Sequence, residues 1–408
     1  MTERIMNSPF DRQLPVYSPI TARSIAAGLR ATVRSSTRAS ALEDLAARVA
    51  ARWRPDSVIL TDSGTSALRV AIEAAMRYTG RTAVALPAFG CYDMITAALG
   101  ATARIILYDV DETSLGPYAD SLDEVLSRDV AAVVGAHLYG VPIDIDDLKA
   151  RAKRVGSLVI EDAAQGSGGA IRDRPLGALG ALSVLSFGRG KGRTGGSGGA
   201  LLLHTAEETA KLTSIIEAIL EPGNLEIDAI GRVLGQWLFG RPSLYGLPAA
   251  IPQLGLGTTH YRLPWPPREI GPCPAAALLA NWQVSDREEV ARRTNGERLT
   301  IAVKALEDLG FVTPQPKASM AVSGYLRFPM LAPSGSIPTI YERHLNELGI
   351  MRSYPTTLQE LAGTDQSIPG YRGAERLSRR LWTLPTHSRL RHPWHGIQAI
   401  QEAFSHSA

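Results

Sequence analysis

The sequence predicts an α/β protein, with a large N-terminal domain built on a mostly parallel sheet flanked by helices and a smaller α/β domain at the C-terminus. Short apolar runs alternate with helical patterns over residues 57–203. This alternation favours a parallel sheet covered on both faces. Several of the runs end in turns of small or polar residues, and ligands bind beyond the carboxyl ends of the strands in such sheets.

Length, charge and cysteine content narrow the class of protein. A chain of 408 residues provides for two domains. Its net charge of +3 is spread thinly, which argues against a nucleic-acid partner. Cys91 and Cys273 form no spaced cluster, so we expect neither a disulfide framework nor a metal site. Because signal-peptide and membrane-span patterns are both missing, we expect a cytoplasmic protein with no membrane partner.

The elements of the large domain follow from apolar periodicity and turn residues. The chain first has a helical pattern over residues 20–53, rich in Ala and Arg near its end. Apolar runs then predict strands at residues 57–61, 82–86, 104–110, 130–136, 157–160, 182–187 and 199–203. Between them the pattern predicts helices at residues 67–78, 94–99, 120–127 and 144–155.

We place the domain boundary at residue 270, which leaves residues 1–270 in the large domain and residues 271–408 in the small one. Residues 222–270 interrupt the alternation because they are rich in Pro, Gly and aromatic residues. They could cover the site, form a subunit contact or pack against the core. Beyond them the pattern predicts helices at residues 275–306, 337–348, 373–381 and 394–404, and a strand at residues 324–328.

A turn of small residues, Asp62-Ser-Gly-Thr-Ser66, joins the strand at 57–61 to the helix at 67–78. At the start of a helix the backbone N–H groups are free and the helix dipole is positive, which suits a phosphate. Ser and Thr are also common helix caps, so a plain N-cap is the alternative.

Lys191 lies in a glycine-rich loop between the last two predicted strands of the sheet. Its neighbours, Gly190 and Gly192, leave room for a planar group beside the lysine amine, as a Schiff-base lysine requires. The alternative is a surface lysine in a flexible hairpin. The residues at the other strand ends favour the first interpretation, because Tyr92, His137, Asp162 and Ser186 should converge on the same crevice.

Four motifs together resemble one known family. They are Ser63-Gly-Thr65, Glu161-Asp-Ala-Ala-Gln165, Ser186-Phe187 and Lys191 with its glycine tail. In this order they resemble the DegT/StrS-type aminotransferases, pyridoxal-phosphate enzymes that mostly aminate keto sugars attached to nucleotides. The resemblance covers residues 20–210 and resumes at residues 349–355 and 381–387. It implies a fold-type I PLP-dependent transferase, pyridoxal 5'-phosphate as cofactor and a homodimer.

The resemblance also implies roles for individual residues. Lys191 would form the Schiff base with the cofactor, and Asp162 would pair with its pyridine nitrogen. A carboxylate there keeps the nitrogen protonated, so that the ring can accept electrons. Gln165 would approach the 3-oxygen. The phosphate would be held by Gly64, Thr65 and Ser186.

The sequence departs from the family pattern at the turn after residue 87. Many relatives place an aromatic residue two positions after Phe89, where it stacks on the cofactor ring, but this chain has Cys91. Tyr92 is our candidate for the stacked residue and Phe89 the second choice. In the lysine loop, relatives often flank the lysine with Thr and Asn and carry a Glu at the position of Ser197.

The leading hypothesis is an aminotransferase in which an amino acid, expected to be glutamate, supplies the amino group. The acceptor would be a keto sugar, expected to be nucleotide-linked, or a related carbonyl compound. Two alternatives stay open: another pyridoxal-phosphate reaction, such as an aldol-type cleavage or transfer, and a non-catalytic regulatory relative. The presence of both Lys191 and Asp162 disfavours the non-catalytic relative.

Overall fold

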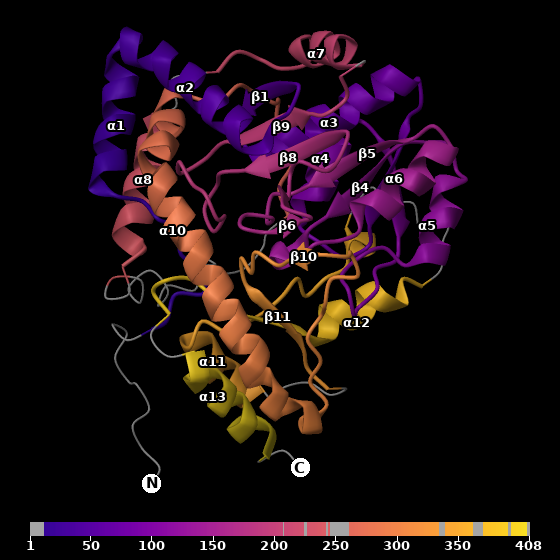
Figure 1. Ribbon diagram of the computed structural model, residues 1–408, viewed down its shortest axis with the longest axis vertical. Helices are drawn as coiled ribbons and strands as arrows, with labels where there is room; N and C mark the ends of the chain where they lie inside the picture. Colours follow the sequence, from indigo (N-terminus) through magenta and orange to yellow (C-terminus); the bar gives the residue numbers. More distant parts are fainter. Residues whose placement is uncertain are drawn as a thin grey trace.

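The computed structural model describes residues 12–206, 208–223, 227–241, 244, 261–333, 339–361, 370–390 and 393–405. Within them, an α/β unit holds a seven-stranded sheet, and a C-terminal unit holds a three-stranded sheet (Figure 1). A second three-stranded sheet is small and joins β6 (Ala170–Ile171) and β7 (Arg174–Pro175) to the distant strand β10 (Ala321–Val322). The predicted fold class is therefore confirmed.

The seven-stranded sheet has the order β1-β9-β8-β5-β4-β2-β3. Only β9 runs against its neighbours, and the pairs from β8 to β3 are all parallel. Its strands are β1 (Ser57–Thr61), β2 (Ala83–Pro87), β3 (Arg104–Tyr108), β4 (Val130–Ala136), β5 (Leu158–Asp162), β8 (Leu182–Ser186) and β9 (Gly199–Leu203). Strands β2, β4 and β9 are buried throughout, as strands covered on both faces should be.

Helices connect and cover these strands. They are α3 (Gly64–Thr79), α4 (Asp93–Gly100), α5 (Ala119–Leu126), α6 (Ile145–Arg154) and α7 (Thr209–Glu217). Two further helices, α1 (Ala22–Val33) and α2 (Ser35–Trp53), precede the sheet and divide the helical stretch expected at residues 20–53. The break falls at Arg34, which has an extended backbone.

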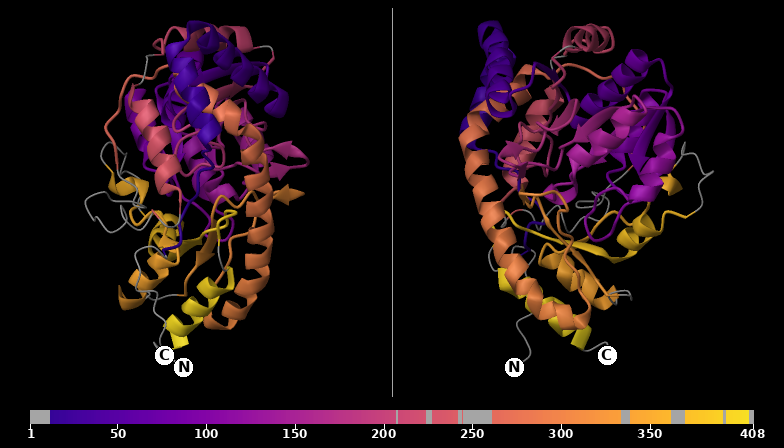
Figure 2. Two further views of the ribbon diagram at one scale, coloured as in Figure 1. Left: turned by 90° about the vertical axis from the view of Figure 1, so that its left-hand side faces the viewer. Right: turned by 45° about the vertical axis from the view of Figure 1, so that its right-hand side comes forward.

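A long helix, α10 (Pro272–Ala302), runs beside α1, α2 and α8 and continues to the C-terminal unit (Figures 1 and 2). There, β11 (Phe328–Leu331), β13 (Leu381–Leu384) and β12 (Met351–Arg352) form an antiparallel sheet. Helices α11 (Thr339–Glu347), α12 (Arg372–Arg380) and α13 (Pro393–Ser405) accompany it. Because α10 packs on helices on both sides of residue 270, the domain boundary stays a prediction.

One expected element is wrong. The strand predicted at residues 324–328 begins only at Phe328. Tyr325 has a left-handed backbone, with φ of 46°, which a strand cannot contain. The preceding residue, Gly324, donates its N–H to the carbonyl of Gly140 at 2.8 Å. Packing against this distant loop therefore replaces the start of the strand.

Residues 224–226, 242–243 and 245–260 of the atypical segment lie outside the described residues. The described parts pack against the large unit. Helix α8 (Ile227–Phe239) buries Ala229 and Val233 against Ile20 and Cys273. Farther on, the carbonyl of Arg262 accepts a hydrogen bond from Thr96 Oγ1 at 2.7 Å.

Helix α12 is docked on the large unit by its N-terminus. The Asp109 carboxylate accepts hydrogen bonds from the backbone N–H groups of Gly373 and Ala374, each at 2.9 Å. An anion at this end of a helix is stabilised by the free N–H groups and the helix dipole. The approach is close, because a Cβ on Gly373 would stand 1.8 Å from the carbonyl oxygen of Val110.

None of the helices in the described part of the chain combines the length and the apolar character needed to cross a bilayer.

We predict that Gly373→Ala destabilises the protein by about 1–3 kcal/mol, since the added methyl group must displace backbone. The control is Gly231→Ala in α8, where an added Cβ would meet nothing within 4 Å. That change should stabilise by up to about 1 kcal/mol, because Ala is the better helix former. Thermal unfolding midpoints measure both. Equal midpoints for the two variants would contradict the docking of α12.

Candidate active site

A pocket of about 470 Å³ lies at the carboxyl ends of the parallel strands. Six of the seven residues singled out in the sequence line it: Gly64, Thr65, Asp162, Gln165, Ser186 and Lys191. The other lining residues are Leu68, Cys91, Asp93, Met94, Ala136, His137, Leu138 and Ala164.

The N-terminus of α3 forms one wall of the pocket. Ser63 caps the helix, because its Oγ accepts the N–H of Ser66 at 3.1 Å. The next residue must be glycine, since a Cβ on Gly64 would stand 2.7 Å from Cβ of Ser186. The free N–H groups of α3 and the hydroxyls of Thr65 and Ser186 together suit an anion.

Consecutive residues of β5 point to opposite sides, as side chains of a strand must. Asp162 faces the pocket, and its Oδ1 accepts the N–H of Ala164 at 2.9 Å. Burial raises the pKa of Asp162, although the Ala164 N–H and the charge of Lys191 act in the opposite direction. Glu161 points away from the pocket, as strand alternation predicts.

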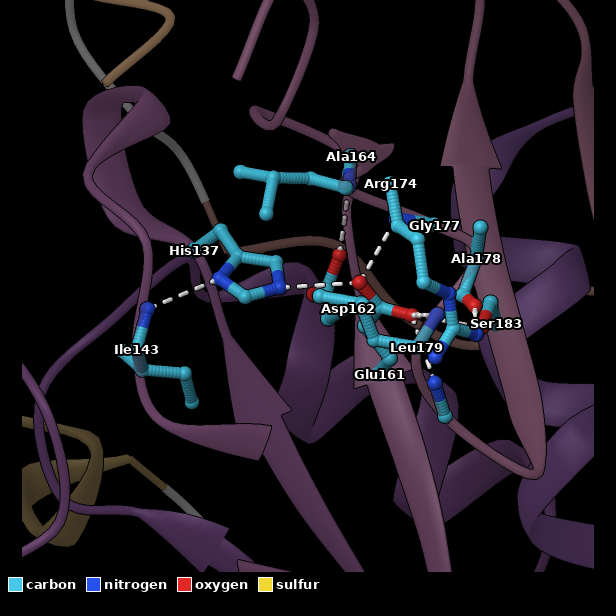
Figure 3. A network of polar contacts seen from close by, with 12 residues as sticks. His137, Ile143, Glu161, Asp162, Ala164, Arg174, Gly177, Ala178, Leu179 and Ser183 are labelled. Carbon is cyan, nitrogen blue, oxygen red and sulfur yellow. Dashed lines mark hydrogen bonds and ion pairs between the residues drawn. The ribbon is translucent and has the colours of Figure 1, made fainter. Parts of the chain in front are cut away.

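The Glu161 carboxylate is fully buried and accepts five hydrogen bonds (Figure 3). Its donors are His137 Nε2 at 3.0 Å, the backbone N–H of Gly177 at 2.6 Å, those of Leu179 and Gly180 at 2.8 Å, and Ser183 Oγ at 2.7 Å. Burial alone raises a carboxyl pKa, but these donors outweigh it and lower the pKa of Glu161 to about 2. The side chain is therefore a stable buried anion.

His137 joins this network to the pocket wall. Its Nδ1 accepts the N–H of Ile143 at 3.1 Å, so the ring proton lies on Nε2 and is donated to Glu161 (Figure 3). Both ring nitrogens are thus used within the chain. We infer that His137 orients the wall of the pocket and transfers no proton.

Lys191 reaches the pocket from the loop between β8 and β9. The loop is tied to the N-terminal segment, because Gly190 donates its N–H to Ser18 Oγ at 2.7 Å. Gly190 also has a left-handed backbone, with φ of 79°. The lysine is therefore presented by a folded loop, and the hairpin alternative is not supported.

Gln165 is held by two aromatic residues. Its Oε1 accepts the N–H of Tyr139 at 2.8 Å, and its Nε2 donates to the hydroxyl of Tyr354 at 2.9 Å. The Tyr139 hydroxyl is also hydrogen-bonded to Ser353. The loop after β12 thereby contacts a residue that lines the pocket.

Tyr92 is the one predicted site residue that does not line the pocket. Its ring lies 5.8 Å from that of Tyr354, and its hydroxyl accepts the N–H of Thr356 at 3.2 Å. Phe89 is also turned to Tyr354, at 5.7 Å. Cys91 lines the pocket instead, and burial raises the pKa of its thiol to about 12, so it is uncharged. The stacking role of Tyr92 stays a prediction.

Sequence reasoning assigned no role to Tyr139, Ser353 or Tyr354, although all three lie within the stretches of the family resemblance. No local pattern shows that Tyr139 and Ser353, 214 positions apart, share a hydrogen bond. Asp93 was also missed, and its carboxylate faces the pocket at the start of α4.

Among the described residues, no group of three or more His, Cys, Asp or Glu side chains could hold a metal ion. The pocket instead combines a lysine amine, a buried carboxyl group and a helix N-terminus. This set can hold an anion at one end and a cationic ring nitrogen at the other, with an amine between them.

The pattern that defines the DegT/DnrJ/EryC1/StrS aminotransferase family matches residues 22–224. This stretch contains every pocket residue. Residues 22–224 therefore belong to the DegT/DnrJ/EryC1/StrS aminotransferase family, which confirms the resemblance seen in the sequence.

Individual relatives share only limited sequence identity with this chain. The L-glutamine:2-deoxy-scyllo-inosose aminotransferase of Micromonospora echinospora is 27% identical over 310 residues, or 74% of this chain and 64% of that one. The L-glutamine:scyllo-inosose aminotransferase of Streptomyces griseus is 31% identical over 180 residues, or 42% of each chain. This chain thus spans less than two thirds of the length of these relatives.

Solved structures share the fold across nearly the whole chain. The sugar aminotransferase CalS13 from Micromonospora echinospora superposes with a TM-score of 0.71 at 21% identity, covering 95% of this chain and 98% of that one. An aminotransferase from Psychrobacter cryohalolentis gives a TM-score of 0.73 at 19% identity, with coverage of 96% and 99%. At sequence identities of 19% and 21%, the structural similarity establishes the fold alone.

We predict that Glu161→Gln destabilises the protein by at least about 2 kcal/mol at pH 7. An amide NH2 group replaces one acceptor oxygen, so at least two buried donors lose their partner at about 1–3 kcal/mol each. The control is Glu124→Gln, an exposed carboxylate paired with Arg128, which should change stability by less than about 1 kcal/mol. Urea unfolding measures both.

Glu161 should also make the stability of the folded protein depend on pH. The pKa of Glu161 is about 2 in the folded chain against an ordinary 4.5, so the unfolded chain binds more protons between these values. Its contribution is fully present above about pH 4.5 and is lost as the pH falls towards 2. Glu161→Gln should therefore lose less stability than the parent between pH 5 and pH 3. Parallel curves for the two proteins would show that Glu161 is not the buried anion.

Proposed function

We propose that this protein is a pyridoxal-phosphate-dependent aminotransferase that transfers an amino group from an amino acid to a keto sugar or a related cyclic ketone. The observation that carries the proposal is the convergence of Lys191, Asp162 and the N-terminus of α3 in one pocket. Membership of an aminotransferase family over residues 22–224 supports it.

The residues present fit pyridoxal 5'-phosphate. Gly64 allows Ser186 to pack against the start of α3, where a Cβ would clash with it, and the helix supplies donors for a phosphate. Asp162 offers a buried carboxyl group for the pyridine nitrogen, and Lys191 offers an amine for the aldehyde. When bound, this cofactor acts as an electron sink for the carbon that carries the amino group.

We propose the following roles for the chain's own residues. Lys191 holds the cofactor covalently and, once its amine is released, moves a proton at the substrate carbon. Asp162 keeps the ring nitrogen protonated. Gln165 is directed at the 3-oxygen from its position beside Tyr139. The phosphate donors are Gly64, Thr65 and Ser186. Tyr92 is retained as the candidate for the residue that stacks on the cofactor ring, although it does not line the pocket.

The identities of the amino donor and of the carbonyl acceptor are also part of the proposal. The names of the relatives give L-glutamine as donor and inososes as acceptors, whereas the sequence led us to expect glutamate and a nucleotide-linked keto sugar. Both acceptors are polyhydroxylated ketones. The carboxylate of Asp93, which lines the pocket, can accept hydrogen bonds from the hydroxyls of such a substrate.

A homodimer also stays a proposal. The glycine tail after Lys191 does not support it, because these glycines are packed within the chain. A Cβ on Gly195 would stand 2.2 Å from the carbonyl oxygen of Pro274, and one on Gly199 2.6 Å from the nitrogen of Gly64. The proposal now rests on family membership alone, and a light-scattering mass of one chain, 43.8 kDa, would refute it.

Borohydride reduction in the presence of pyridoxal 5'-phosphate should fix the cofactor to the peptide that contains Lys191. Lys191→Ala should lose this label and the visible absorbance band, because Lys191 is the only lysine that lines the pocket among the residues that the structure describes. Lys153→Ala, at an exposed position, should keep both. Peptide mapping by mass spectrometry decides the outcome. Label on another lysine would refute the assignment of Lys191.

The substrate is tested in two stages. Incubation with L-glutamine or L-glutamate should remove the absorbance band of the lysine-bound cofactor, and a true acceptor should restore it. We expect recovery with a keto-cyclitol such as scyllo-inosose or with a nucleotide-linked keto sugar, and the comparison of the two defines the acceptor. Loss of the band with an amino acid but recovery with neither ketone would refute the proposed substrate class.

A further inference from the structure

The loop that carries Lys191 is rich in glycine, and its conformation needs anchors. Glycine loses more conformational freedom on folding than any other residue, so an unanchored loop of this composition would be mobile. Ser18 anchors the loop before Lys191, at Gly190. The first side chain after the lysine is that of Arg193.

Arg193 is buried, with 2% of its side chain exposed, and it points into α10. Its Nη2 lies 3.0 Å from Glu289 Oε1 and 2.5 Å from Asp286 Oδ1. Its guanidinium lies over the ring of Trp282, 4.4 Å from the ring centroid. A guanidinium held by two carboxylates and an aromatic face has a defined position.

Glu289 connects two segments that line the pocket. Its Oε1, which pairs with Arg193, also accepts a hydrogen bond from Ser167 Oγ at 2.5 Å. Ser167 follows Gln165 by two residues and lies directly against the lysine loop, since a Cβ on Gly192 would stand 2.2 Å from Cβ of Ser167. The carboxylate is nearly inaccessible, at 6% exposure, so it is weakly screened by solvent.

We propose that Arg193 is a positioning residue, which fixes the backbone of Lys191 by anchoring it to Glu289 on α10. The chain leaves Lys191 through Gly192, which has no side chain of its own to hold it. This contact between Arg193 and Glu289, called the Arg193 clamp below, therefore sets where the lysine amine enters the pocket. The effect of the Arg193 clamp on the reaction rests on the proposed function, whereas its effect on the conformation of the loop does not.

Arg52 provides a matched control. Its Nη2 pairs with Glu289 Oε2 at 2.7 Å, and its Nη1 lies 3.4 Å from Asp286. It therefore contacts the same two carboxylates as Arg193. It lies on α2, however, and not on the lysine loop. A change at Arg52 perturbs the charges of the cluster but leaves the loop anchor in place.

The first test is hydrogen exchange of the protein without added cofactor. In Arg193→Met, peptides covering residues 187–199 should exchange at least about tenfold faster than in the parent. Peptides from β4 should be unchanged. Arg52→Met should stay within about twofold of the parent in residues 187–199. If Arg193→Met fails to fold, Arg193→Lys keeps the charge but loses the planar fork, and it should show the same change to a smaller degree.

Unchanged exchange in residues 187–199, or an equal increase in Arg52→Met, would overturn the proposal, because the cluster would then serve general stability only. The second test is the rate of borohydride-trapped attachment of pyridoxal 5'-phosphate to Lys191. Arg193→Met should slow attachment about 10- to 100-fold, because a displaced amine meets the aldehyde in a poor geometry. Failure of the parent protein to attach the cofactor would refute the proposed function. The hydrogen-exchange result would still show whether Arg193 anchors the loop.

Discussion

The buried carboxylate of Glu161 is the constraint on which the pocket depends. A charge at 0% exposure is tolerated only when its hydrogen-bonding capacity is filled, and here five donors fill it. The donors come from β8, from the loop before it and from the end of β4. One side chain thus sets the spacing of three segments and leaves its neighbour, Asp162, directed into the pocket.

The charged and polar residues at the pocket are of two kinds: some are fully engaged in hydrogen bonds within the chain, and others face the cavity. The Glu161 carboxylate accepts the Nε2 proton of His137, and Nδ1 of His137 accepts the N–H of Ile143, so both side chains are committed to hydrogen bonds within the chain. Asp162 and Lys191 face the cavity with few internal partners, and burial raises the pKa of Asp162. Groups with perturbed ionisation in a cavity are typical of functional sites.

The local sequence determined much of the large unit. Strands at residues 57–61, 130–136 and 199–203 were predicted with the bounds that the structure shows, because an apolar run between turns is a local signal. The rule that strand ends share one edge of a parallel sheet was enough to expect Asp162, Ser186 and Lys191 in one pocket. The alternation of side chains along a strand is enough to place Asp162 and Glu161 on opposite sides.

Only the tertiary structure decided which distant residues complete the site. Tyr354 reaches Gln165 from 189 positions away, and Ser18 reaches Gly190 from 172 positions away. The strand expected at residues 324–328 was displaced because Gly324 packs against Gly140. Local patterns record which faces of an element are apolar, but not which element will cover them. A contact between segments far apart in the chain depends on the path of every element between them, so it exists only once the chain has folded.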